Sequence, residues 1–182
     1  MKKIYYIGIY ISLLTTSYYL PIKPTFASYM LPYPSVMPGN KIYKVMKLVD
    51  SAKKYWYWGS IASASYHREL ADKFLVEAKT LMEYQQYLLG VDALRRSDEQ
   101  VQQILPYIKR GKSEGKDMSL QQQKVIEQMI EHERVIVLMK SSVPSETVWT
   151  PEKTAATALP LHALLQNAYD IRMEIQKAVV GK

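Results

Sequence analysis

The stretch LADKFLVEAKTLM at residues 70–82 carries the clearest helical pattern in the chain. Its apolar residues recur three and four positions apart, which places them on one face of an α-helix. Opposite charges also stand four positions apart, as in the pair Arg68 and Asp72, and this spacing is typical of ion pairs on a helix surface. We therefore expect a long helix over about residues 61–89, with one apolar buried face and one charged solvated face.

An extended arm and a shorter helix are expected before this long helix. Residues 28–40 contain three prolines and Gly39, which keep the chain out of a helix. Asn40 is a suitable N-cap for a helix that begins at residue 41 and ends at about Tyr57. The apolar residues of this helix recur at the 3.6-residue period and predict a buried stripe made of Ile42, Val45, Met46, Val49, Ala52 and Trp56.

Breaker residues divide the remainder of the chain. Gly90 is expected to end the long helix, and a third helix should follow over residues 91–110, kinked or shortened by Pro106. Residues 111–118 are polar and contain two glycines, so they are predicted to be a linker. Ser119 is the expected N-cap of a fourth helix that ends near residue 140.

The last helix and the fold class follow from the same signals. Thr150, Pro151 and Glu152 supply the N-cap, the N1 proline and the early acid of a helix that reaches about Val180. Because no segment alternates convincingly with period 2, we predict an all-α fold. This fold is a helical bundle of four to five amphipathic helices preceded by the extended Pro-rich arm.

The bundle is predicted to contain two parts of the chain. Residues 41–110 form the first helical domain, and residues 119–182 form a C-terminal helical hairpin that packs on the same bundle.

The first 27 residues have the features of an export signal, and they precede the arm. Lys2 and Lys3 are followed by a charge-free apolar run at residues 4–20. Thr25-Phe26-Ala27 places small residues at the −3 and −1 positions of a peptidase site, so cleavage is predicted after Ala27. The protein is then secreted or extracytoplasmic. The alternative is an uncleaved N-terminal membrane anchor, because the apolar run is at the short limit of what spans a bilayer.

The composition restricts the classes of partner. The chain has no cysteine, which excludes disulfides, thiolate metal sites and a lipid-modified cysteine. The net charge of +7 falls to +4 once the three lysines of residues 1–27 are removed, because 24 − 3 = 21 basic residues remain against 17 acidic ones. A nucleic-acid partner is therefore not expected, and membrane contact is expected only through an uncleaved signal segment.

No constellation of catalytic or metal-binding residues is recognisable. His67, His132 and His162 are on different predicted helices, and none has a glutamate three residues before it as in di-iron bundles. The chain also lacks the His-Glu-x-x-His and Gly-x-Ser-x-Gly patterns. We therefore assign no catalytic residue, no metal ligand and no cofactor, and expect isolated histidines on helix surfaces.

These observations favour an exported, non-enzymatic helical protein of the cell envelope that binds or scaffolds. One alternative is a small extracytoplasmic metal-binding or hydrolytic bundle whose His and Glu residues meet only in the fold. Another is an extracytoplasmic sensory module.

Four consecutive aromatic residues, Tyr55, Trp56, Tyr57 and Trp58, are the candidate binding residues. Consecutive side chains point around all sides of a helix end, so the four cannot share one buried face. Exposed members could stack on a sugar, a peptide or the membrane interface. The expected partner is an envelope or extracellular protein, or a glycan. Alternatively, two or three of these rings fill the space between the first two helices.

The LPYP stretch at residues 31–34, with Pro38, Asn40 and Tyr43 after it, and the ELADK stretch at residues 69–73 together resemble a known family. They are similar to the start of the exported bacterial and archaeal family catalogued as domain of unknown function 5667. The likeness covers about residues 28–110. It implies helical hairpins outside the cytoplasm and implies no established activity.

The processing site generates a testable prediction. We expect the exported protein to begin at Ser28, because the small residues at the Thr25-Phe26-Ala27 site lie in chain that prolines keep extended. N-terminal sequencing of the exported protein measures this directly. A sequence beginning at Met1 would instead support the membrane anchor.

Overall fold

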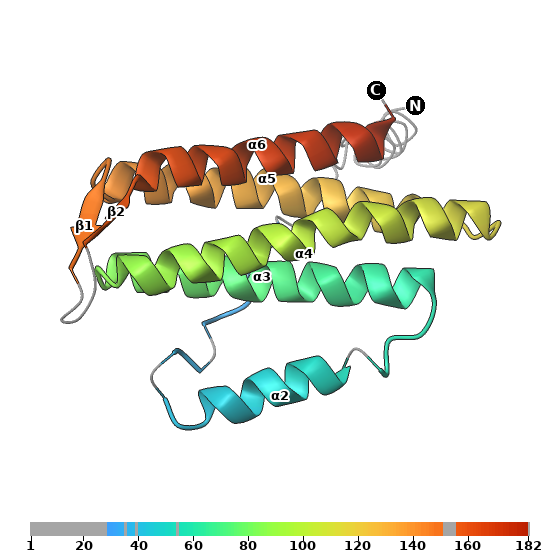
Figure 1. The fold of residues 1–182 in the computed structure, drawn as a ribbon. Coiled ribbons are helices and arrows are strands. Elements are labelled where there is room, and N and C mark those ends of the chain that lie inside the picture. Colours follow the sequence, from blue (N-terminus) through green and yellow to red (C-terminus); the bar gives the residue numbers. More distant parts are fainter. Residues whose placement is uncertain (1–28, 35, 39, 54, 151–155, 182) are drawn as a thin grey trace, which may run out of the picture.

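The computed structural model describes residues 29–181 except 35, 39, 54 and 151–155 (Figure 1). Of residue 47 it describes the backbone but not the side chain. The predicted export signal at residues 1–27 lies outside the described residues. The described residues form five α-helices and one two-stranded sheet, so the predicted all-α bundle is confirmed.

Four helices form an antiparallel bundle that runs up and down in chain order (Figure 1). They are α3 (Ser60–Glu83), α4 (Tyr87–Ser113), α5 (Ser119–Ser142) and α6 (Leu161–Val180). Helix α3 lies beside α4 and α5, and α6 lies beside α5 and α4. Helix α2 (Tyr43–Lys53) lies outside this bundle, along the open side of α3 (Figure 1).

The bundle core consists of two groups of buried apolar side chains at opposite ends of the helices. Leu75, Leu94, Ile136 and Leu165 belong to the group nearer the α3–α4 turn. Val101, Ile104, Met129 and Ile175 belong to the group at the other end. The stripe predicted for residues 70–82 is buried at Ala71, Leu75, Ala78, Leu81 and Met82, and it is only half-buried at Leu70 and Phe74.

The boundary between α3 and α4 is earlier than predicted. Helix α3 ends at Glu83, and Gln85 takes a left-handed conformation with φ of 59°. Gly90 then lies inside α4, where a Cβ atom would come 2.8 Å from Cγ of Met82. The prediction that Gly90 breaks the helix is therefore wrong, because this glycine allows the first turn of α4 to approach α3 closely.

The end of α4 also differs from the prediction. The helix continues through Pro106 to Ser113, so the proline does not shorten it. Gly111 is buried in its last turn against Met118, which leaves residues 114–118 as the connection instead of residues 111–118. Helix α5 begins with Ser119, so this residue is not the N-cap that was predicted. The backbone N–H of Ser119 donates to Oδ1 of Asp117 at 2.9 Å.

A small β-hairpin occupies the place where the last helix was predicted to begin. Strands β1 (Thr147–Trp149) and β2 (Thr157–Leu159) pair antiparallel, with Val148 opposite Ala158. Helix α6 therefore begins only at Leu161, after Pro160. The prediction that a helix starts at Thr150 is therefore wrong. Pro151 and Glu152, the other two residues of the predicted start signal, lie outside the described residues. The hairpin was missed because three-residue strands are too short to show alternation.

Helix α2 does not bury the stripe predicted for it. It ends at Lys53 and not at Tyr57, although Oδ1 of Asn40 does accept the Ile42 N–H at 3.0 Å, close to the start of the helix. Ile42, Val45, Val49, Ala52 and Trp56 are exposed, and only Met46 of the predicted stripe is half-buried. None of the helices among the described residues is both long and apolar enough to cross a membrane.

Candidate functional site

The aromatic candidates lie in the segment that joins α2 to α3. Tyr55, Trp56 and Trp58 are 79%, 82% and 84% exposed. Tyr57 alone of the four is partly buried: its Oη donates to Oε2 of Glu69 at 3.1 Å, and its ring lies 5.2 Å from that of Tyr66. The alternative in which two or three rings fill an interhelical space is therefore wrong.

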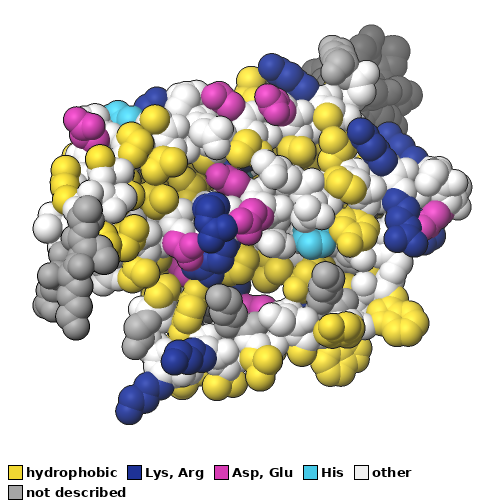
Figure 2. Space-filling view, in the orientation of Figure 1, with side chains coloured by type: hydrophobic (Ala, Val, Ile, Leu, Met, Phe, Trp, Pro, Cys, Tyr) yellow, Lys and Arg dark blue, Asp and Glu magenta, His cyan; other side chains and the backbone are white. Residues whose placement is uncertain are grey.

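A stripe of apolar side chains on α2 continues this exposed aromatic segment. Val45, Leu48, Val49 and Ala52 have the i, i+3, i+4, i+7 spacing of one helix face, and all four are exposed, Leu48 to 71%. Hydrophobic side chains gather along this edge of the molecule, over α2 and the segment after it (Figure 2). We call this region the α2 surface; it consists of Val45, Leu48, Val49, Ala52, Tyr55, Trp56 and Trp58.

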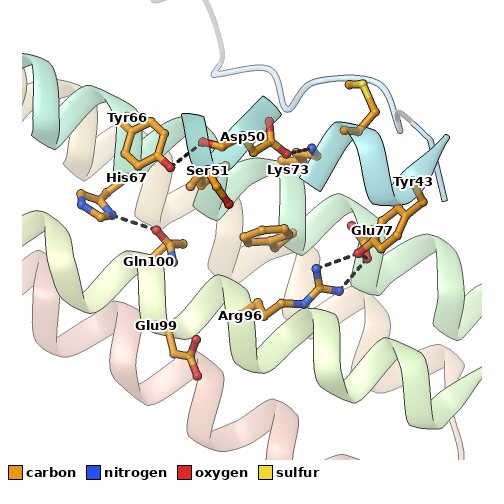
Figure 3. Close-up of a pocket in the computed structure, with 13 residues that line it drawn as sticks. Tyr43, Asp50, Ser51, Tyr66, His67, Lys73, Glu77, Arg96, Glu99 and Gln100 are labelled. Carbon is orange, nitrogen blue, oxygen red and sulfur yellow. Dashed lines mark hydrogen bonds and ion pairs between the residues drawn. The ribbon is translucent and has the colours of Figure 1, made fainter. Parts of the chain in front are cut away.

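Polar contacts on the opposite face of α2 attach it to the bundle (Figure 3). The Tyr43 hydroxyl donates to Oε1 of Glu77 at 2.8 Å and accepts from Nη1 of Arg96 at 2.8 Å. Arg96 also forms an ion pair with Glu77 at 2.7 Å. The amphipathic helix is thus held through its polar side, which leaves its apolar side outward.

Asp50 makes the second attachment of α2. Its carboxylate forms an ion pair with Lys73, and its backbone carbonyl accepts from Oη of Tyr66 at 2.9 Å. Both partners are on α3, so this attachment and the Tyr43 contacts hold α2 at two points along that helix.

Two cavities flank α2 where it crosses α3. One, of about 270 Å³, opens between α2, α3 and α4 (Figure 3). The other, of about 430 Å³, lies between α2, α3 and the arm, and Met30 and Tyr33 line it. Open space therefore lies on both sides of the polar attachments, and the half-buried Met46 side chain of α2 lines both cavities.

The acidic and basic side chains that line the first cavity are in ion pairs, and that of Glu99 is with Arg95, outside the cavity. Asp50 pairs with Lys73, and Glu77 pairs with Arg96, whose guanidinium also lies 4.6 Å from the centre of the Phe74 ring. Burial and then the hydrogen bond to Glu77 raise the pKa of the Tyr43 phenol, so it stays protonated at neutral pH. This cavity therefore presents a neutralised polar lining, suited to holding α2 in place.

His67 stands at the far end of the same cavity. Its Nδ1 lies 2.8 Å from Oε1 of Gln100, and its ring stacks on Tyr107 with 5.2 Å between centroids. His67 thus joins α3 to α4 by packing and hydrogen bonding, and it is buried, unlike the helix-surface histidine that was expected.

A second polar cluster lies inside the bundle, between the two apolar groups of the core. His132 is fully buried; its Nε2 lies 2.7 Å from Oδ1 of Asp72, and its Nδ1 accepts from Nε of Arg172 at 3.2 Å. The Arg172 guanidinium is fully buried too, and its Nη1 bonds Oδ1 of Asp98 at 2.6 Å while its Nη2 donates to Oγ of Ser97 at 2.9 Å.

This polar layer connects all four helices of the bundle and the arm. Gln128 of α5 donates to Asp72 and accepts from Nε of Arg68 at 3.1 Å. The Tyr29 hydroxyl of the arm donates to Oδ2 of Asp72 at 2.5 Å. The prediction that Arg68 and Asp72 form a solvated ion pair is wrong, because both are buried and bond side chains of α5.

Burial determines the protonation states in this layer. It lowers the pKa of His132 to about 4, more than the hydrogen bond to Asp72 raises it, so the imidazole is neutral and carries its proton on Nε2. Burial and the neighbouring Asp72 carboxylate raise the pKa of Tyr29, which keeps the phenol a donor. Enclosed in this way, the layer acts as a structural connection, with His132 out of reach of a substrate.

The sequence positions of Arg172 and His132 already indicate that both side chains face the core. Arg172 falls in the apolar stripe of α6, four residues after Ala168 and three before Ile175. His132 stands likewise between Met129 and Ile136 on the buried face of α5. A polar residue at such a position must be buried with a partner, although the sequence does not say which partner.

Among residues 29–181 as far as they are described, no three His, Asp or Glu side chains are grouped so that they could hold a metal ion. No protein-family model, no curated protein and no solved structure matches the chain. The resemblance to the exported family of unknown function therefore stays a prediction.

The buried imidazole generates a prediction about pH. Between its ordinary pKa of 6.5 and about 4, the unfolded chain binds a proton at His132 that the native protein does not. We expect the free energy of unfolding to fall by up to about 3 kcal/mol on going from pH 7 to pH 4 through this residue. Denaturant unfolding at several pH values measures it.

The variant His132→Gln should lose this part of the pH dependence. His162→Gln is the matched control, because His162 is only partly buried and contacts the Val143 carbonyl at 3.1 Å. An identical pH dependence in wild type and His132→Gln would contradict a neutral buried imidazole.

The buried guanidinium generates a second prediction. Arg172→Met leaves Asp98 without its counter-ion, and we expect a loss of about 3–5 kcal/mol in the free energy of unfolding. Adding Asp98→Asn should recover part of the loss. Arg95→Met, which removes only exposed ion pairs, should change little. Equal effects of Arg172→Met and Arg95→Met in urea denaturation would refute the role of the layer.

Proposed function

We propose that this chain is an exported, non-enzymatic helical protein of the cell envelope that binds or scaffolds through its α2 surface. One observation carries the proposal: α2 turns its polar side to the bundle and its apolar side outward. Val45 and Leu48 are 57% and 71% exposed, whereas Tyr43 and Asp50 make the attachments.

The cost of this arrangement supports a binding role. An apolar side chain of this size gains about 1.5–3 kcal/mol when it leaves water, and α2 forgoes that gain at several positions. Contiguous exposed apolar patches on folded proteins mark interaction sites. The aromatic residues Tyr55, Trp56 and Trp58 extend the patch with rings that are favoured in binding interfaces.

The bundle in this proposal serves as the rigid support. Its buried polar layer holds four helices together, and the α2 attachments project from α3 and α4. Binding at the outward face of α2 leaves those attachments intact, because they lie on the other side of the helix.

Site-specific photo-crosslinking in the native envelope tests the proposal. A photoreactive amino acid at Leu48 should form adducts with an envelope component, because this side chain of the α2 surface is 71% exposed. The matched control is the same amino acid at Gln103, an exposed position on α4, where we expect no such adduct. Equal labelling at the two positions, or none at Leu48, would contradict the proposal.

A further inference from the structure

The charged residues of the segment that carries the α2 surface are mostly of one sign. Residues 41–58 contain five lysines and a single acid, Asp50. Asp50 is turned inward and paired with Lys73 of α3, and its other carboxylate oxygen lies 4.0 Å from Nζ of Lys53, so this one acid offsets only part of the positive charge of the segment. Lys41, Lys44 and Lys53 are exposed, and the outward side of this segment is therefore cationic.

The lysines border the apolar stripe on both sides. Successive residues turn by about 100° around an α-helix, so Lys44 lies just beyond Leu48 on one edge of the stripe and Lys53 just beyond Val49 on the other. Lys or Arg side chains are visible beside the hydrophobic ones along this edge of the molecule (Figure 2). An apolar face flanked by cations is complementary to the surface of an anionic membrane.

The aromatic residues have the matching chemistry. Trp56 and Trp58 are more than four-fifths exposed, directly after the last turn of α2. Tryptophan and tyrosine concentrate at the headgroup level of bilayers, where the ring is partly apolar and its polar atom stays hydrated. Lysine is depleted at protein–protein interfaces relative to the rest of the surface, whereas it is common beside the apolar face of helices that lie on anionic membranes.

The dimensions fit a helix that lies on a membrane. Helix α2 has 11 residues, which corresponds to a length of roughly 16 Å, about half of a bilayer's hydrocarbon thickness. Its inward contacts through Tyr43 and Asp50 lie on the face opposite Val45 and Leu48, so the outward face can enter the headgroup layer while the bundle remains folded.

We propose that the α2 surface binds the headgroup layer of membranes rich in anionic phospholipid, with α2 lying parallel to the bilayer. This inference rests on the proposed function and names its partner. It adds a second membrane contact to the one expected from an uncleaved N-terminal segment.

Tryptophan quenching by brominated lipid tests the inference on the full chain. The chain has three tryptophans. The variant Trp149→Phe leaves Trp56 and Trp58 as reporters, and the double variant Trp56→Phe with Trp58→Phe leaves Trp149 in the β1 hairpin as the matched control. With vesicles of brominated phosphatidylcholine and phosphatidylglycerol, we expect strong quenching of the first pair and little of Trp149. An N-terminal anchor alone would not produce this difference.

Two further variants probe the two parts of the surface. Leu48→Glu should weaken vesicle binding about tenfold or more, whereas Val137→Glu, at an exposed apolar position on α5, should not. Lys44→Glu with Lys53→Glu should also weaken binding, and raised salt should do the same. Circular dichroism of each variant confirms that its helices are intact.

The possible results separate this inference from the proposed function. Absence of quenching at Trp56 and Trp58, or equal quenching by vesicles of brominated phosphatidylcholine alone, would overturn the anionic-membrane inference. If Leu48 then still crosslinks to an envelope protein or glycan, the proposed function stands with a different partner. Failure of both experiments overturns both.

Discussion

The fold depends on one buried constraint, the hydrogen-bonded layer in which Arg172 bonds Asp98, Ser97 and His132 at the centre of the bundle. A guanidinium without water must have all its partners in place, and here those partners come from α4 and α5. His132 extends the layer to Asp72 of α3. These directional bonds join residues of all four helices, so they restrict the mutual arrangement of the helices in addition to the packing of the apolar groups on either side.

Polar contacts with α3 position the arm and α2, and the buried layer supplies the first of them. Tyr29 bonds Asp72 from outside the bundle, which holds the arm against α3. Further along the chain, Tyr43 and Asp50 bond Glu77 and Lys73 on the same helix. Leu31 and Met37 of the arm pack against one apolar group of the core, but α2 is attached through these polar contacts and its described residues join neither group. As a result, the apolar side of α2 stays exposed and forms the α2 surface.

The helical periodicity of α3 identified a real buried face, since Leu75, Ala78 and Leu81 are all in the core. The same reasoning failed for α2, because periodicity shows that a helix has an apolar face but not whether another element covers it. It also failed for Arg68 and Asp72, whose spacing is equally compatible with a wet ion pair and with two separate buried partners. The candidate residues Tyr55, Trp56 and Trp58 were singled out from the sequence, whereas the α2 stripe that continues them was predicted to be buried and did not include Leu48.

The sequence by itself determined the helical class, the approximate positions of the helices and the aromatic segment at residues 55–58, because these follow from local spacing and residue type. Only the tertiary structure decided which face of α2 points outward, that His132 and Arg172 meet Asp72 and Asp98 inside the bundle, and that Gly90 packs within a helix. Each of these results depends on contacts between residues far apart in the chain, and no local pattern specifies such contacts.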